Sequence, residues 1–211
     1  MVATETRSEF VEQKPNRGML CAVLLNPSFN AGNTISHANL DVATTSLGFN
    51  DFQIVNLVQI PSRNSKDLAQ MATRQEEWLL SRPEIDKALN SADEVAFAWG
   101  ASRLADDANR YKEEQITWTV QQALRAGHSE VLLMDGSPRH PSRWRQYVGP
   151  QKMRVAGDTL EDRFRSVLNR HPIETLWSAG EKRLSEARAM MKQVSSVKEE
   201  MDPSERGSRR S

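Results

Sequence analysis

The chain has a single cysteine, Cys21, among its 211 residues. One cysteine excludes an intramolecular disulfide and any metal site built from several cysteines. The apolar runs are far shorter than the roughly 20 residues that a membrane span needs. The N-terminus is polar and no apolar segment follows it, so we expect no secretory signal. These absences predict a soluble, cytoplasmic protein that does not contact a membrane.

An excess of one charge is also lacking. The 28 Lys and Arg balance the 28 Asp and Glu, so the formal net charge is zero. An anionic partner must therefore be met by a local patch. Composition and length predict one domain with polar ends. We expect a polar N-terminal arm over residues 1–17, an α/β domain over 18–178, an amphipathic helix over 179–200 and a disordered tail over 201–211.

Four short apolar runs are typical of buried parallel strands. They are Met19–Leu25, Phe52–Val58, Val95–Trp99 and Val131–Met134. Helical stretches lie between them, at about Ser36–Ser46, Asn64–Ala72, Pro83–Asn90 and Ser102–Ala126. This alternation fits βαβ crossovers. The sequence therefore predicts a single α/β domain with a four-stranded, mostly parallel sheet flanked by helices, followed by the C-terminal helix.

Two polar strings follow predicted strands. Leu25-Asn26-Pro27-Ser28 follows the first, and Gly136-Ser137-Pro138-Arg139-His140-Pro141-Ser142 follows the last. Loops that leave the carboxyl ends of parallel strands converge on one crevice, where ligands bind. We therefore expect Asn26 and His140 to lie in one site.

Asn26 is neutral, so it cannot act as a strong base, but its amide can orient water or read a polar group. The alternative is that Asn26 caps the next turn. His140 lies between two prolines and can donate a hydrogen bond to developing negative charge, as imidazolium or as a neutral tautomer. The alternative is a structural histidine. The four histidines have no ligand-like spacing, so we expect no metal and no cofactor.

The segment Gly136–Gly157 contains five basic residues, no acidic residue, and the aromatic residues Trp144 and Tyr147. Such a segment suits phosphates and stacked bases. Either aromatic residue could act as a wedge in a base stack, although Trp144 could instead cover the core beneath the loop. The alternative for the whole segment is a solvated loop whose charges pair with acidic helices.

These strings resemble the two active-site motifs of the uracil-DNA glycosylase superfamily. Asn26-Pro27-Ser28, with Gly32, His37 and Asn39 beyond it, is similar to the first motif of the mismatch-specific branch. His140-Pro141-Ser142 is similar to the second. Over about residues 18–150 the chain more closely resembles the DUF1643 family. The residues that carry this likeness are Leu25–Ser28, Asn56, Ala98-Trp99-Gly100 and Pro138–Pro141.

The resemblance implies a DNA glycosylase that flips a base out of the stack and hydrolyses its N-glycosidic bond. Asn26 and His140 would then be catalytic, one on the water or sugar side and the other at the leaving base. The expected substrate-binding residues are Pro27, Ser28, Phe29, His37, Asn39, Asn56, Trp99 and Arg139. The expected DNA-binding residues are Ser142, Arg143, Trp144, Arg145 and Lys152. We expect DNA as the partner and no obligatory protein partner.

Departures from the superfamily pattern bear on the substrate. The activating Asp of the classical uracil enzymes is missing, Ser28 replaces a Gly, and Arg139 precedes the motif histidine. These changes favour a base other than uracil. The resemblance extends in role to antiviral glycosylases that remove modified cytosines, such as glucosylated hydroxymethylcytosine, from phage DNA. Because no Lys adjoins either motif, we expect hydrolysis without strand cleavage.

Two other functions stay open at this point. One is a nucleic-acid-binding module without turnover. The other is a hydrolase of small nucleosides or nucleotides. Within the glycosylase hypothesis, Asp41 or Asp51 could serve as the base in place of Asn26, although a helix-surface role for Asp41 and a turn role for Asp51 are favoured.

Overall fold

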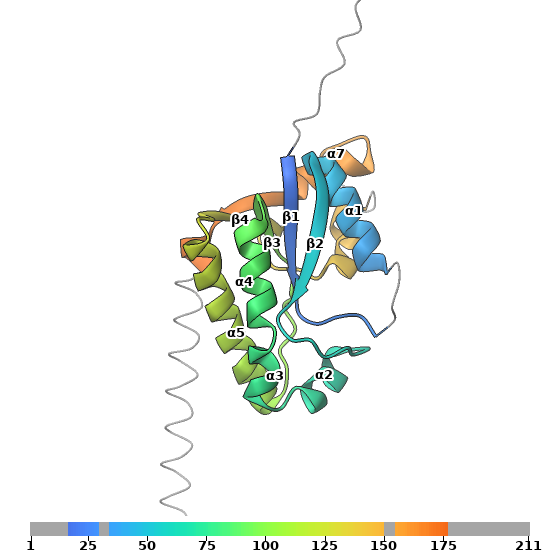
Figure 1. Cartoon of the computed structure of the whole chain (residues 1–211). Coiled ribbons are helices and arrows are strands. Elements are labelled where there is room, and N and C mark those ends of the chain that lie inside the picture. Colours follow the sequence, from blue (N-terminus) through green and yellow to red (C-terminus); the bar gives the residue numbers. More distant parts are fainter. Residues whose placement is uncertain (1–16, 30–33, 150–154, 177–211) are drawn as a thin grey trace, which may run out of the picture.

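The computed structural model describes residues 17–29, 34–149 and 155–176 (Figure 1). The predicted arm before Arg17, the helix predicted at 179–200 and the tail predicted at 201–211 lie outside the described residues. The described part forms one sheet in the strand order β2-β1-β3-β4-β5, with helices on both faces.

Four parallel strands correspond to the four apolar runs. They are β1 (Arg17–Leu24), β2 (Phe49–Asn56), β3 (Glu94–Phe97) and β4 (Glu130–Met134). The sheet also has a fifth strand that the sequence did not predict. This strand, β5 (Leu168–Pro172), pairs antiparallel with β4. Only Leu168 of β5 is buried, so the strand has no apolar run to mark it.

The predicted helical stretches correspond to α1 (Ile35–Leu47), α2 (Ser65–Met71), α4 (Arg82–Ser91) and α5 (Asp106–Arg125). The hydroxyl of Thr34 caps the start of α1, and Gly48 ends it with a φ of 80°. The remaining helices are short and were not predicted: α3 (Gln75–Leu79), the 3₁₀ helix η1 (Pro141–Arg143), α6 (Arg145–Val148) and α7 (Leu160–Val167).

Alternate residues of β1 build the two halves of the core, because successive side chains of a strand point to opposite faces. Cys21 and Val23, with Leu25 just after the strand, belong to the cluster that α3, α4 and α5 cover. Leu20, Ala22 and Leu24 belong to the cluster that α1, α6 and α7 cover. The domain is therefore a three-layer α/β/α arrangement, and β1 is an interior strand of its sheet, between β2 and β3 (Figure 1).

The winding of the chain reverses at β1. The connection through α1 places β2 on one side of β1, and the connection through α2, α3 and α4 places β3 on the other. Such a reversal opens a crevice outside the carboxyl ends of the two adjacent strands. Here those ends are β1 and β3, which lead into Asn26 and Trp99.

In the part of the chain that the structure describes, no helix combines the length and the apolar character needed to cross a bilayer.

Leu20→Ala should lower the free energy of unfolding by about 2–5 kcal/mol, since the side chain is fully buried on an interior strand and its removal leaves a cavity. Leu80→Ala is the matched control, because that leucine is 75% exposed. Urea denaturation measures both. An equal effect of the two substitutions would contradict the placement of β1 in the core.

Candidate functional site

A pocket of about 1260 Å³ lies at the crevice between β1 and β3. Its walls come from the loops after β1, β2, β3 and β4 and from the start of α1. This volume exceeds the roughly 300–1,000 Å³ of a typical small-molecule cleft. The four strand ends thus converge as the sequence predicted.

Most of the predicted site residues line this pocket. These are Asn26, Pro27, Ser28, His37, Asn56, Trp99, Arg139, His140, Ser142 and Arg143. Phe29, Asn39, Trp144 and Arg145 are not among the lining residues, and Lys152 lies outside the described residues.

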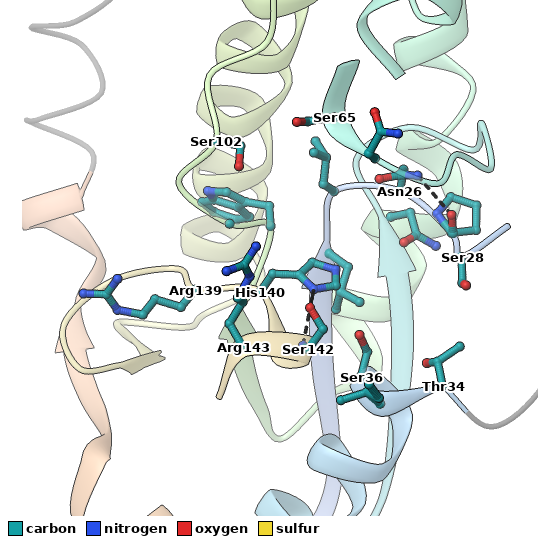
Figure 2. A pocket seen from close by; sticks show the side chains of 18 of the residues that line it. Asn26, Ser28, Thr34, Ser36, Ser65, Ser102, Arg139, His140, Ser142 and Arg143 are labelled. Atoms are coloured by element: carbon teal, nitrogen blue, oxygen red, sulfur yellow. Dashed lines mark hydrogen bonds between the residues drawn. The ribbon is translucent and has the colours of Figure 1, made fainter. Parts of the chain in front are cut away.

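The side-chain nitrogen of Asn26 joins the loops after β1 and β2. It donates to the carbonyl oxygens of Pro27 (3.0 Å) and Ile60 (3.2 Å) and to the hydroxyl of Ser62 (3.0 Å). The Ser62 hydroxyl itself donates to the carbonyl of Asn64, so it accepts from Asn26. Three acceptors around one amide atom identify that atom as nitrogen. The carbonyl oxygen of Asn26 consequently faces into the pocket, on the side of His140 (Figure 2).

His140 faces the pocket from the loop after β4. Its Nδ1 accepts the backbone N–H of Ser142 at the start of η1 and lies 2.9 Å from the Ser142 hydroxyl. An accepting Nδ1 leaves the proton of a neutral imidazole on Nε2. Burial and the nearby Arg143 guanidinium lower the pKa of His140 below its ordinary value. The ring is therefore neutral at pH 7, with Nε2–H facing the pocket (Figure 2).

Gly100 brings the loops after β3 and β4 together. Its N–H donates to the carbonyl of Pro138 at 2.6 Å. The glycine has a φ of 82°, and an added Cβ would lie 3.5 Å from Cβ of His140. The contact places Trp99 at the pocket beside His140. Because Trp99 is 7% exposed and packs on Phe97 with 4.5 Å between ring centroids, only a small part of its surface is available to a ligand.

Asn56 contributes an acceptor without a partner. The residue is 8% exposed, lines the pocket from the end of β2, and its Oδ1 is buried without a hydrogen bond within the described structure. A buried carbonyl oxygen left this way is costly unless a bound group donates to it. His37 lines the same pocket from α1 and packs edge-on against Phe52, with 4.9 Å between ring centroids.

The charge of the pocket is positive. Among the described residues its lining contains Arg63, Arg139 and Arg143 and no Asp or Glu. Arg143 lies beside His140, whereas Arg139 points away from it (Figure 2). Arg139 pairs with Asp135 (3.6 Å) and stacks on Tyr147 (4.2 Å to the ring centroid). Arg143 is therefore the arginine that places positive charge next to His140.

The carboxylates considered as alternative bases do not reach the pocket. Asp41 is exposed along α1, as expected for a helix surface. Asp51 lies near the start of β2, at the opposite end of the strand from the pocket, rather than in a turn. The described residues also contain no cluster of His, Cys, Asp or Glu that could hold a metal ion.

Two of the predicted contact residues, Asn39 and Trp144, are buried beneath the pocket, and the exposed Arg145 is bonded to one of them. Asn39 is fully buried, donates to the carbonyl of Pro141 (2.7 Å) and accepts from Nε of Arg145 (2.9 Å). Trp144 is 1% exposed and donates to the carbonyl of Arg139 (2.7 Å). Trp144 thus covers the core, the second of the two roles weighed for it. Together these residues fix the loop that carries His140 against α1.

The loop after β2 also lines the pocket, and the sequence did not predict its residues as part of the site. Ser62, Arg63, Asn64 and Ser65 all line the pocket. They form a polar string shortly after the apolar run Phe52–Val58, so the rule that identified Asn26 and His140 could also have identified them.

Asn39→Ala should lower the free energy of unfolding by about 2–4 kcal/mol, since it leaves the buried Pro141 carbonyl and Arg145 Nε without their partner. Asp41→Ala, an exposed change on the same helix, should alter it by less than about 0.5 kcal/mol. Urea denaturation compares the two. If Asn39→Ala were as stable as Asp41→Ala, the proposed anchoring of the His140 loop would be wrong.

The His140 ring should titrate below the usual histidine pKa of about 6.5 in an NMR pH series. Because the unfolded chain takes up this proton first, the folded state loses stability as the pH falls below about 6.5. Arg143→Gln should raise the midpoint, since it removes a repelling charge. Arg125→Gln, at the far end of α5, should leave it unchanged. A midpoint at or above 6.5 in the unsubstituted protein would contradict the desolvated site.

Comparison with known protein families gives one match. A family model described as "Protein of unknown function (DUF1643)" matches residues 8–142, which are 135 of the 211 residues. No curated protein and no solved structure matches the chain. The matched region includes the carboxyl ends of β1 to β4, with Asn26 and His140. Since the match covers more than half of its length, the chain belongs to the DUF1643 family.

Proposed function

We propose that this protein is a DNA glycosylase that hydrolyses the N-glycosidic bond of a flipped nucleotide and leaves an abasic site. The observation that carries the proposal is the pairing of two groups across one pocket. The accepting oxygen of Asn26 and the donating Nε2–H of His140 come from the ends of β1 and β4 and face the same space (Figure 2).

His140 suits the leaving base. When the bond between C1′ and the base nitrogen breaks, its electron pair moves onto the base. A neutral imidazole N–H, fixed before the reaction, stabilises such developing charge by hydrogen bonding. Arg143 adds positive charge beside it.

Asn26 suits the sugar side. As the base departs, C1′ becomes oxocarbenium-like, as in other glycosyl transfers. A cation of this kind reacts with water that is oriented rather than strongly deprotonated. The amide oxygen of Asn26 can accept a hydrogen bond from that water, whose oxygen bonds to C1′ while its proton passes finally to the released base. No lysine lines the described pocket, which favours hydrolysis over Schiff-base chemistry.

The charge and size of the pocket support a DNA substrate with an enlarged base. Arg63 and Arg143 lie where phosphates of an extruded nucleotide could bind. A cavity of about 1260 Å³ has room for more than a plain pyrimidine. We therefore extend the proposal to modified cytosines, including glucosylated hydroxymethylcytosine of phage DNA, and to a role in antiviral defence. The proposed site of action is the cytoplasm.

A second candidate is a nucleotide-binding or nucleic-acid-binding protein without turnover. It is favoured by one observation, the absence of any carboxylate base among the described lining residues.

An abasic-site assay tests the proposal. Purified protein is incubated with duplexes that contain uracil, mismatched thymine or modified cytosine and with glucosylated phage DNA, then treated with alkali. At least one substrate should become alkali-labile, with no strand cleavage before alkali. His140→Asn should lower the rate about 10²–10³-fold, because asparagine can still accept the Ser142 N–H but lacks the Nε2–H donor. Asn26→Ala should abolish base release.

Two controls separate the candidates. Asp41→Asn changes an exposed carboxylate outside the pocket and should retain full activity. His140→Asn should bind DNA within about threefold of the unsubstituted protein. If every DNA remains stable to alkali while still being bound, the protein is a binding module. Release of free base from mononucleosides at a similar rate would instead favour a small-nucleoside hydrolase.

A further inference from the structure

One exposed aromatic side chain at the rim of the pocket is not used by the proposed reaction. Phe29 follows the first polar string and is 56% exposed, although it is among the largest apolar side chains. The guanidinium of Arg63 lies over its ring, 4.9 Å from the centroid. We call Phe29 and Arg63 together the stacking lip.

We propose that Phe29, supported by Arg63, enters the DNA base stack at the gap that a flipped nucleotide leaves. The inference rests on the proposed function in that it takes duplex DNA as the partner. It assigns the wedge to the loop after β1, on the side of the pocket that carries Asn26.

The stacking lip is a preformed unit. Ser28 and Ser62 form a parallel β-bridge, which holds the loops after β1 and β2 side by side. The side-chain nitrogen of Asn26 adds hydrogen bonds to Ile60 and Ser62 across the same junction. A side chain that is fixed before binding loses little conformational entropy when it inserts, which favours a wedge at this position.

The aromatic residues expected to act as wedges are less suited to insertion. Trp144 is 1% exposed, and its indole N–H donates to the carbonyl of Arg139. Tyr147 is half-buried, whereas Phe29 is exposed. Phe29 is therefore the aromatic side chain with the most exposed surface at the described rim.

The charge around the lip identifies the partner as an anionic stacked polymer. Arg63 lines a pocket that also contains Arg139 and Arg143 and, among the described residues, no Asp or Glu. Aromatic rings and guanidinium planes stack on bases regardless of their identity, and the positive charge attracts the backbone. Ile35, 66% exposed at the start of α1, extends the apolar rim on which a base pair could rest.

The test uses a duplex with one tetrahydrofuran abasic analogue flanked by 2-aminopurine, with the intact duplex as reference. The analogue has no base to excise, so binding is measured independently of catalysis. The unsubstituted protein should bind the abasic duplex more tightly than the intact one and quench the 2-aminopurine. Phe29→Ala should raise the Kd for the abasic duplex about tenfold, the scale of one base–aromatic stack, and remove the quenching. Its Kd for the intact duplex should change less than twofold.

Companion variants distinguish stacking from charge and from folding. Phe29→Trp should retain tight binding and quenching. Arg63→Gln should weaken binding to both duplexes. It should also reduce the slope of log Kd against log salt concentration by about 1, the amount expected for one lost phosphate contact. Leu80→Ala removes an even more exposed apolar side chain that does not line the pocket, and it should have no effect on either duplex. Thermal unfolding of Phe29→Ala should match that of the unsubstituted protein.

Each outcome decides the proposal. If Phe29→Ala binds the abasic duplex as tightly as the unsubstituted protein, or loses affinity equally for both duplexes, the wedge assignment is wrong. If base release occurs in the abasic-site assay while Phe29→Ala binds normally, the glycosylase proposal stands and the wedge alone fails. If Phe29→Ala loses the abasic preference but no base is ever released, the wedge stands and the glycosylase proposal fails. An unsubstituted protein that binds neither duplex overturns both.

Discussion

The candidate site depends on the position of β1, which pairs with β2 on one side and with β3 on the other. The chain leaves β1 toward one side of the sheet and later returns on the other, so the loops after β1 and β3 separate where the strands end. The crevice is therefore a consequence of the strand order itself. The polar string after β1 is brought to it by backbone hydrogen bonds, while the apolar residues of the same strand bury into both halves of the core.

Hydrogen bonds within the protein then fix the orientation of Asn26 and His140 at the strand ends. One polar atom of each side chain bonds to the protein, and the other faces the pocket. The donor end of Asn26 holds the loop after β2, which leaves its acceptor end to face the pocket. Nδ1 of His140 caps η1, which leaves Nε2–H to face the pocket. In both residues the structural interaction determines which atom a ligand meets. The structural and functional roles that the sequence weighed as alternatives for these two residues are therefore compatible.

The sequence could predict the parallel strands because each is an apolar run, and it could predict the pocket because polar strings follow those runs. It could not predict β5, whose only buried residue is Leu168 and whose Arg170 pairs with Glu94 across the sheet. Asn39 and Trp144 were expected at the ligand for a related reason. The partner of Asn39 is the carbonyl of Pro141, 102 positions away, and the partner of Trp144 is the carbonyl of Arg139 on its own loop; no local pattern in the sequence shows that either bond forms.

The charges around the pocket favour separate roles for the arginines, His140 and Asn26 in the proposed reaction. A carboxylate beside Arg143 would offset the positive charge that stabilises a departing, negatively charged nucleobase. The described lining of the pocket contains no carboxylate. Burial and the nearby Arg143 both disfavour an imidazolium, and they lower the pKa of His140. A neutral imidazole avoids that repulsion and still donates a hydrogen bond. The arginines then supply the positive field, His140 supplies the directed donor, and the uncharged Asn26 can hold water without reducing either.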